Sequence, residues 1–284
     1  MHARVAALIQ IKIGSKSGAH IVYFEYILCN IHARALRQQR MTTVARQDIH
    51  NSGIPLVCQS CEARHGGICG ALSPHELVEL NKHTKRIKVR AGTELLAEEQ
   101  PITSYSNVIS GVVKLSKLLE DGRQQIVGLQ FPPDLLGRPF RELSNVTAEA
   151  ATDAELCTFT RAALEQAVNG SHAMTTRLHE QSLRELDEAR EWMLTLGRKT
   201  AYEKVASFLG LIVSAHDANK VEPEREHSIQ LPLSRGEMAD FLGLTIETVS
   251  RQMSALRKHE IIEFANAHTV RIKDRVALNA ASGS

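Results

Sequence analysis

Three cysteines crowd into one short segment near residue 60, with a spacing suited to metal chemistry. Cys58 and Cys61 form a Cys-x-x-Cys pair, and Cys69 follows after seven further residues. The chain of 284 residues holds only five cysteines, too few for the disulfide framework of a secreted protein. Thiolates are soft ligands that favour iron-sulfur clusters or zinc. The crowding therefore predicts a metal site rather than disulfide bridges.

The identity of the metal stays open on these residues alone. Zinc held by four thiolates is common, but such sites usually pair two Cys-x-x-Cys arms, and this segment has one. A [4Fe-4S] cluster needs four ligands, one more than the segment holds. Thiols without any metal are the third alternative. Gly66, Gly67 and Gly70 would let the backbone wrap closely around whatever is bound.

A second distinctive set of residues lies between Ser234 and Lys258, where apolar residues at helical spacing are interrupted by Gly243. Two helices joined at this glycine would each bury one face. The residues expected on those faces are Met238, Ala239 and Leu242, then Ile246, Val249, Met253 and Leu256. This pattern is typical of a helix-turn-helix.

The outward positions of the second helix are polar and predict a DNA-reading surface. They are Glu247, Thr248, Ser250, Arg251 and Arg257. Arginine can donate two hydrogen bonds to guanine, and glutamate can accept one from cytosine. A surface ion pair between Glu247 and Arg251 is the alternative, and it would contribute only about 0.3 to 0.5 kcal/mol. Within a helix-turn-helix, base readout is the favoured interpretation.

Two β segments, 261–264 and 269–272, follow these helices and predict the wing of a winged helix. Basic residues beside the helix and in the wing are natural contacts for DNA phosphates, although each could equally be a solvated surface charge. They are Arg257, Lys258, Arg271 and Lys273.

The segments that position these two sites have different sequence patterns, some typical of β-strands and others of helices. Residues 85–160 show short β segments separated by turn residues every 8 to 12 positions, which favours an antiparallel sandwich or barrel. Ahead of them, Ser73 and Glu76 form a capping box around Pro74, which predicts a helix from Pro74. Residues 172–196 contain no glycine or proline and predict one long helix.

The long helix carries a stripe of residues that recur at spacings of three and four. Its members are His179, Ser182, Leu186, Ala189, Met193 and Leu196. Such a stripe needs a partner. It either packs on the β domain of its own chain or forms the seam of a two-stranded dimer, and the dimer is the favoured interpretation.

Composition excludes several classes of protein. Apolar residues make up 43% and charged residues 23%, and 34 Lys and Arg nearly balance 32 Asp and Glu, so the bulk charge predicts no partner. No apolar run reaches the roughly 18 residues of a membrane span, and we expect a cytoplasmic protein without a membrane partner. Residues 1–40 lack periodicity; they are either a native tail or the product of a start codon placed ahead of Met41.

The residues from Cys58 to Asp274 resemble the CRP/FNR superfamily of bacterial transcription regulators, most closely its oxygen-responsive FNR/FnrN/FixK branch. The order of elements, the signature Glu247-Thr-Val-Ser-Arg251 and the cysteines carry the resemblance. It implies an α+β fold, with an antiparallel β-roll similar to cyclic-nucleotide-binding domains, a long dimerisation helix and a winged helix-turn-helix. The predicted divisions are a poorly ordered extension at 1–50, a sensor domain at 51–171, the helix at 172–198 and a DNA-binding domain at 199–284.

The resemblance also implies a function. The chain would be an oxygen- or redox-responsive regulator, not an enzyme, that binds TTGAT-type palindromes as a homodimer and controls anaerobic or microaerobic genes of respiration or nitrogen fixation. By resemblance, Glu247, Ser250 and Arg251 read the bases. The implied ligands of a [4Fe-4S] cluster are Cys58, Cys61, Cys69 and Cys157, and the implied seam is Leu186, Ala189, Met193 and Leu196. Residues 119–122 resemble the exposed β turn through which relatives contact RNA polymerase, but they could equally be a solvated hairpin tip.

Control by the cluster is likewise implied, because in relatives the intact cluster favours the dimer and oxygen converts it to a [2Fe-2S] form that weakens DNA binding. The spacing of seven between Cys61 and Cys69 is similar to the rhizobial FnrN type and longer than the enterobacterial one. Cyclic nucleotide sensing is poorly supported. Gly137 is followed by Arg138 rather than glutamate, and residues 145–148 lack the arginine that would hold the cyclic phosphate. A regulator controlled by another effector, without a cluster, is the alternative.

Overall fold

The computed structural model describes residues 54–59, 61–218, 227–266 and 268–283. These all belong to one compact unit. The expected N-terminal extension, with Cys29 and Met41, lies outside the described residues. Within the described ranges, no helix is long and apolar enough to cross a bilayer.

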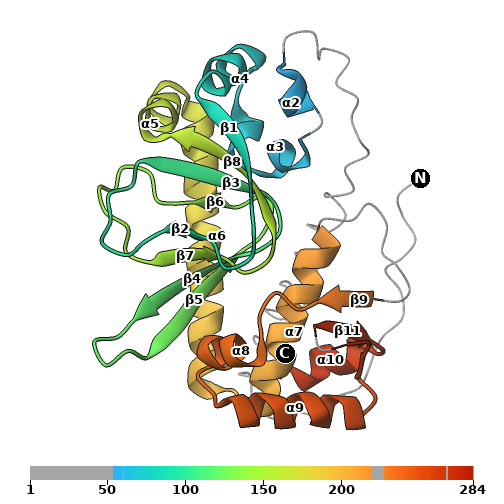
Figure 1. The fold of residues 1–284 in the computed structure, drawn as a ribbon. Helices are drawn as coiled ribbons and strands as arrows, with labels where there is room; N and C mark the ends of the chain where they lie inside the picture. The colour runs from blue at the N-terminus through green and yellow to red at the C-terminus, as the bar shows by residue number, and fades with distance from the viewer. Residues whose placement is uncertain (1–53, 60, 219–226, 267, 284) are drawn as a thin grey trace, which may run out of the picture. The chain divides into compact units, whose positions relative to one another are not determined.

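Two antiparallel sheets of four strands each form the β-roll (Figure 1). The first has the order β1 (Thr84–Val89), β8 (Ala154–Thr160), β3 (Ser104–Ser110) and β6 (Leu135–Leu136). The second has the order β2 (Glu94–Leu96), β7 (Thr147–Ala150), β4 (Val113–Leu118) and β5 (Gln124–Gln130). The predicted antiparallel β architecture is therefore confirmed. Strands β2, β6 and β7 escaped prediction because two to four residues are too short to show alternation.

The core of the β-roll lies between the two sheets. Val108 and Leu156 of the first sheet pack against Val113 and Ala148 of the second, and all four are at most 1% exposed. Burial of such side chains is the main stabilising contribution to the roll. It fixes which face of β3 and β8 points inward to this core and which points to the other side.

Among the described residues, four short helical segments precede the first strand. They are α2 (Leu56–Gln59), α3 (Glu62–Gly66), the 3-10 helix η1 (Ile68–Ala71) and α4 (Pro74–Asn81). Helix α4 begins at Pro74 as predicted, because the Ser73 hydroxyl accepts from the Glu76 amide and the Glu76 carboxylate accepts from the Ser73 amide at 2.8 Å.

Three helices follow the β-roll: α5 (Arg161–Gly170), α6 (His172–Arg198) and α7 (Ala201–Ala218). Helix α6 is the predicted long helix, and it passes behind the sheets in the view of Figure 1. Its stripe is not packed on the β domain of its own chain: Leu186 is 45% and Met193 73% exposed. The first of the two interpretations of this stripe is therefore wrong, and in the single chain the stripe is uncovered.

The C-terminal elements form the predicted winged helix-turn-helix. They are β9 (His227–Gln230), α8 (Arg235–Leu242), α9 (Ile246–Lys258), β10 (Ile262–Phe264), β11 (Thr269–Ile272) and α10 (Arg275–Ala281). Gly243 ends α8 in the left-handed conformation, with φ of 61°, where glycine carries no steric penalty. The expected core residues are buried except Ile246, which is 52% exposed because it opens α9 ahead of the turn that meets the core.

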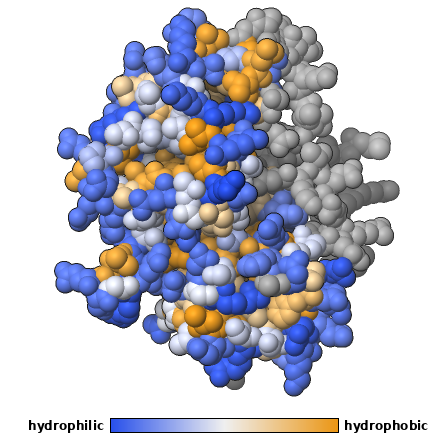
Figure 2. Space-filling model, in the orientation of Figure 1, coloured by the Kyte–Doolittle hydropathy of each residue, from blue (hydrophilic) through white to orange (hydrophobic). Residues whose placement is uncertain are grey.

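The surface seen in Figure 2 is mixed. Hydrophilic residues cover most of this face, and hydrophobic residues form separate patches among them. Scattered apolar residues of this kind are ordinary on a protein surface and indicate no binding site by themselves.

Candidate functional site

Four cysteines line one cavity of about 130 Å³, which we call the cysteine cavity. Cys58 lies in α2, Cys61 precedes α3, Cys69 lies in η1, and Cys157 lies on β8. All four are partly buried thiols that form no disulfide. The fold thus brings the distant Cys157 to the three cysteines of the segment 58–69, the cysteine loop.

The cysteine loop folds tightly because glycine lets its backbone approach itself. A side chain at Gly70 would place its Cβ 2.6 Å from the Arg64 carbonyl oxygen, closer than real contacts allow. At Gly66 a Cβ would meet the Pro133 ring at 2.8 Å. Glycine is therefore required for close packing at these two positions, while the expected wrap around a bound group stays a prediction.

The sheet beneath the loop presents a row of three polar side chains. Cys157 on β8 is paired directly with Arg86 on β1 and with Asn107 on β3. Residues paired in this way point to the same face of an antiparallel sheet. Arg86 donates to the carbonyl oxygen of Val57 at 2.7 Å, which ties β1 to helix α2. The row therefore forms the floor of the cysteine cavity.

Asn107 reaches from this floor to the loop. Its side-chain amide donates to the sulfur of Cys69 at 3.4 Å. The residue is only 3% exposed, and its Oδ1 is buried without a hydrogen-bond partner in the described part of the chain. Asn107 is thus a buried amide placed between a sulfur of the loop and one of the sheet.

The electrostatics of the cavity favour neutral thiols as long as no metal is present. Burial, together with the neighbouring thiols, raises the pKa of Cys69 and of Cys157 to about 12. The same causes raise the pKa of Cys58, while the positive charges of Arg86 and Arg64 act in the opposite direction. A metal bound here would have to displace protons from these sulfurs.

The donor set and its arrangement suit an iron-sulfur cluster. Four thiols line the cavity, and thiolates are the ligands of [4Fe-4S] clusters. Within the described ranges, no three Cys, His, Asp or Glu side chains meet closely enough to hold a single metal ion. Zinc would require four sulfurs within about 2.3 Å of one point, whereas a cluster of four irons fills a larger space. The four thiols of the cavity thus supply the donor set that a cluster needs.

Helix α6 contacts the cysteine loop directly. Arg177 of α6 donates to the carbonyl oxygen of Gly66 at 2.7 Å and lies 3.5 Å from that of His65. These are carbonyls at the end of α3, which has no further turn to satisfy them. Ile68 of the loop and Met174 of α6 are buried in the same core, at 1% and 0% exposure. The loop and the start of α6 therefore share hydrogen bonds and one buried core.

The predicted reading residues lie on the surface of α9. Thr245 caps the helix by accepting from the amide of Thr248 at 3.2 Å. Glu247, Ser250 and Arg251 are exposed. Arg251 donates to the Thr248 hydroxyl at 3.3 Å, and among the described residues it forms no ion pair with Glu247. Hydrogen bonds from its own amide and from Thr245 lower the pKa of Glu247.

Two of the four expected phosphate contacts already have carboxylate partners in the wing. Arg271 lies 3.2 Å from Glu263, and Lys273 lies 3.8 Å from Glu260. The Arg257 guanidinium instead lies over the ring of Phe264, 5.4 Å from its centroid. All three cations stay partly exposed, so DNA could compete for them.

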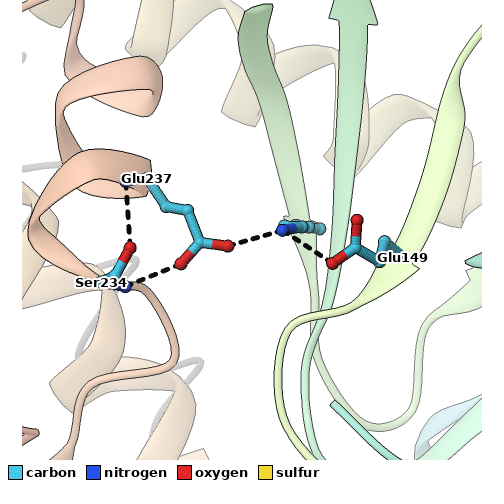
Figure 3. A network of polar contacts seen from close by, with 4 residues as sticks. Glu149, Ser234 and Glu237 are labelled. Atoms are coloured by element: carbon cyan, nitrogen blue, oxygen red, sulfur yellow. Dashed lines mark hydrogen bonds and ion pairs between the residues drawn. The ribbon is translucent and has the colours of Figure 1, made fainter. Parts of the chain in front are cut away.

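A partly buried ion network joins the β-roll to the helix-turn-helix (Figure 3). The ammonium of Lys114 on β4 lies 2.5 Å from Glu237 of α8 and 2.9 Å from Glu149 of β7. Burial opposes the charges, but the hydrogen bonds outweigh it, so the pKa of Glu237 lies below its ordinary value and that of Lys114 above. Since Glu237 also caps α8 at Ser234, the network fixes the orientation of α8 against the roll.

Sequence reasoning missed Asn107, Arg177 and Lys114. Arg177 and Lys114 are ordinary cations, and the contacts that matter here, to Gly66 and to Glu237, lie more than 100 residues away along the chain, so no local signal marks them. Asn107 did carry a signal, because asparagine is depleted in β-strands.

Comparisons with known proteins agree with this architecture. The model of the cyclic nucleotide-binding domain matches residues 86–171, and that of the Crp-like helix-turn-helix domain matches residues 203–281. The chain is 53% identical over 233 residues to a probable transcriptional activator of Rhizobium leguminosarum bv. viciae, covering 81% of this chain and 95% of the relative. It is 39% identical over 227 residues to the transcriptional activator protein FnrL of Cereibacter sphaeroides, covering 80% and 92%. The structure of FixK2 from Bradyrhizobium japonicum superposes with a TM-score of 0.64 and 32% identity, covering 71% and 98%.

Proposed function

Since the chain belongs to the FNR/FixK branch of the CRP/FNR superfamily of transcription regulators, we propose that it is an oxygen-responsive regulator controlled by a [4Fe-4S] cluster. Its domains and its relatives are those of transcription regulators, so the chain is a transcription regulator of this type and not an enzyme. It would act in the cytoplasm as a homodimer on TTGAT-type palindromes, and its targets would be anaerobic or microaerobic genes.

The observation that carries the sensing half of the proposal is the convergence of four thiols on one cavity. Cys58, Cys61, Cys69 and Cys157 would hold the cluster, which would supply an oxygen-sensitive redox centre. Three of these ligands come from one loop and the fourth from a sheet strand. Their binding would therefore pin the loop to the β-roll.

The dimer would form along the uncovered stripe of α6. Leu186, Ala189, Met193 and Leu196 are exposed in the single chain, and a second copy would cover them through the same surface. Two-fold symmetry would then place two reading helices about 34 to 36 Å apart, on successive major grooves. Glu247, Ser250 and Arg251 would contact base edges, and Thr248 and Arg257 would lie beside them.

The β4–β5 hairpin is the proposed contact with RNA polymerase. Leu119 at its tip is 52% exposed, and the neighbouring Asp121 pairs with Arg123 of the same turn. Nothing in the described chain covers this tip, which leaves it accessible to a partner.

Communication between loop and dimer would run through Arg177, and this gives a specific prediction. Replacing Arg177 by methionine removes its charged hydrogen bonds to the loop carbonyls, which are worth about 1.5 to 3 kcal/mol each. We expect anaerobic Arg177→Met protein to keep its iron and sulfide while the dimer weakens by roughly tenfold or more. Sedimentation measured beside metal analysis checks both parts. Arg123→Met, which removes an exposed ion pair, should change neither.

The proposal as a whole is tested on protein purified without oxygen. A broad visible absorption band, iron and sulfide should be present and the protein should bind a TTGAT palindrome; exposure to air should bleach the band and weaken binding. Colourless protein that binds the palindrome equally in air would instead support a regulator controlled by another effector, without a cluster.

A further inference from the structure

We propose that Asn107 sets the oxygen sensitivity of the cluster by donating a hydrogen bond to the sulfur of one ligand, Cys69. This inference rests on the proposed function, because it concerns the cluster that the four cysteines would hold. Asn107 is not itself a ligand. It would act as a positioning and tuning residue through the sulfur that it contacts.

The geometry places Asn107 between two of the four ligands. Its neighbour across the sheet is Cys157, the ligand on β8. Its amide nitrogen lies 3.4 Å from the sulfur of Cys69, the ligand in η1. No other described side chain donates a hydrogen bond to that sulfur. Asn107 thus contacts Cys69, the ligand from the loop, and lies on the strand that pairs with β8, which carries the ligand Cys157.

The unpartnered oxygen of Asn107 makes the amide costly to the stability of the fold. A buried polar atom without a partner costs about 1 to 3 kcal/mol. A leucine, which has the same number of side-chain heavy atoms, would leave no such atom on this strand. Ser106 offers a contrast: it is also buried, on the opposite face of β3, but its hydroxyl is paired with Thr158 at 2.8 Å. The sulfur of Cys69, to which the Asn107 N–H donates, explains why an amide stands at this position.

The chemistry of the contact decides its direction. A ligand thiolate can only accept a hydrogen bond, so the N–H of Asn107 must face it. Hydrogen bonds to sulfur are one of the factors that set the reduction potential of a cluster. A donor stabilises the more negative, reduced state and makes loss of an electron less favourable. Without Asn107, the cluster should therefore be oxidised more readily.

The test compares three variants with wild type, all prepared without oxygen. Asn107→Leu replaces the amide by an apolar side chain with the same number of heavy atoms, and Asn107→Ser removes it without adding apolar bulk. Ser106→Ala is the matched control, since it deletes a buried polar group from the opposite face of the same strand. The measurements are iron and sulfide content, the midpoint potential, and the rate at which the visible band bleaches in air.

We expect both Asn107 variants to keep their iron, to show a lower midpoint potential, and to bleach roughly twofold to tenfold faster than wild type, the range that removal of one hydrogen bond allows. Ser106→Ala should behave as wild type. Unchanged potential and bleaching in both Asn107 variants would overturn the proposal. So would loss of iron from both with the fold intact, which would assign Asn107 to cluster assembly instead. Wild-type protein without iron and sulfide would refute the proposed function itself, a separate result.

Discussion

Cys157→Ala protein purified without oxygen is expected to contain almost no iron or sulfide and to have lost its oxygen-responsive DNA binding. The reason lies in the position of Cys157, the one cysteine of the cysteine cavity that belongs to the sheet. The remaining three thiols come from one loop, and a [4Fe-4S] cluster with four protein ligands cannot be completed from them. Metal and sulfide analysis beside a gel-shift assay on a TTGAT palindrome measures both effects.

Cys29→Ala is the matched control for this prediction, because Cys29 is the fifth cysteine of the chain and lies outside the described residues. It should retain wild-type iron, absorption and binding. Full retention of the cluster by Cys157→Ala would mean that the fourth ligand is assigned to the wrong residue. Loss of the cluster in both variants would point to misfolding or to a different ligand set.

Local chemistry was enough to predict the elements that carry the site. The capping box at Ser73 and the left-handed turn at Gly243 are set by neighbouring residues, and the structure has both. The long strands and helix α6 have a periodic pattern of apolar residues, and in the structure each forms the type of element that this pattern predicts. Ile246 shows the limit: helical spacing placed it on the buried face, but the first residue of a helix can lie beyond the core that its later turns meet.

The floor of the cysteine cavity could not be predicted from the sequence. Arg86, Asn107 and Cys157 form a row only because β1 and β3 both pair with β8 in particular registers. A shift of one residue in either pairing would turn the side chain of Arg86 or of Asn107 to the other face of the sheet. Register between strands 50 or more residues apart is set by packing of the whole roll, and the sequence around each strand does not encode it. The contact between Arg177 and the loop escaped prediction for the same reason.

Arg251→Ala is expected to weaken binding to a TTGAT palindrome by about 1 to 3 kcal/mol for each half-site, the value of one bidentate contact to guanine. Arg251 is exposed on α9, and within the described part of the chain it has no carboxylate partner to release before it meets a base. Arg251 can therefore bind a base at a small cost in free energy. Because a dimer carries two copies, the loss at a full palindrome should exceed the loss at a single half-site. Fluorescence anisotropy at fixed salt measures it.

Sequence preference distinguishes this role from simple charge attraction. Wild-type protein should discriminate strongly against replacement of the guanine in TTGAT, and Arg251→Ala should bind both sequences about equally. Lys258→Ala, which removes an exposed cation from the end of the same helix, should weaken both sequences alike and reduce the slope of log affinity against log salt by about 0.9 for each phosphate that the protein no longer neutralises. If Arg251→Ala kept the wild-type preference and changed only the salt slope, Arg251 would be a phosphate contact, and the reading of guanine would belong to another side chain of α9.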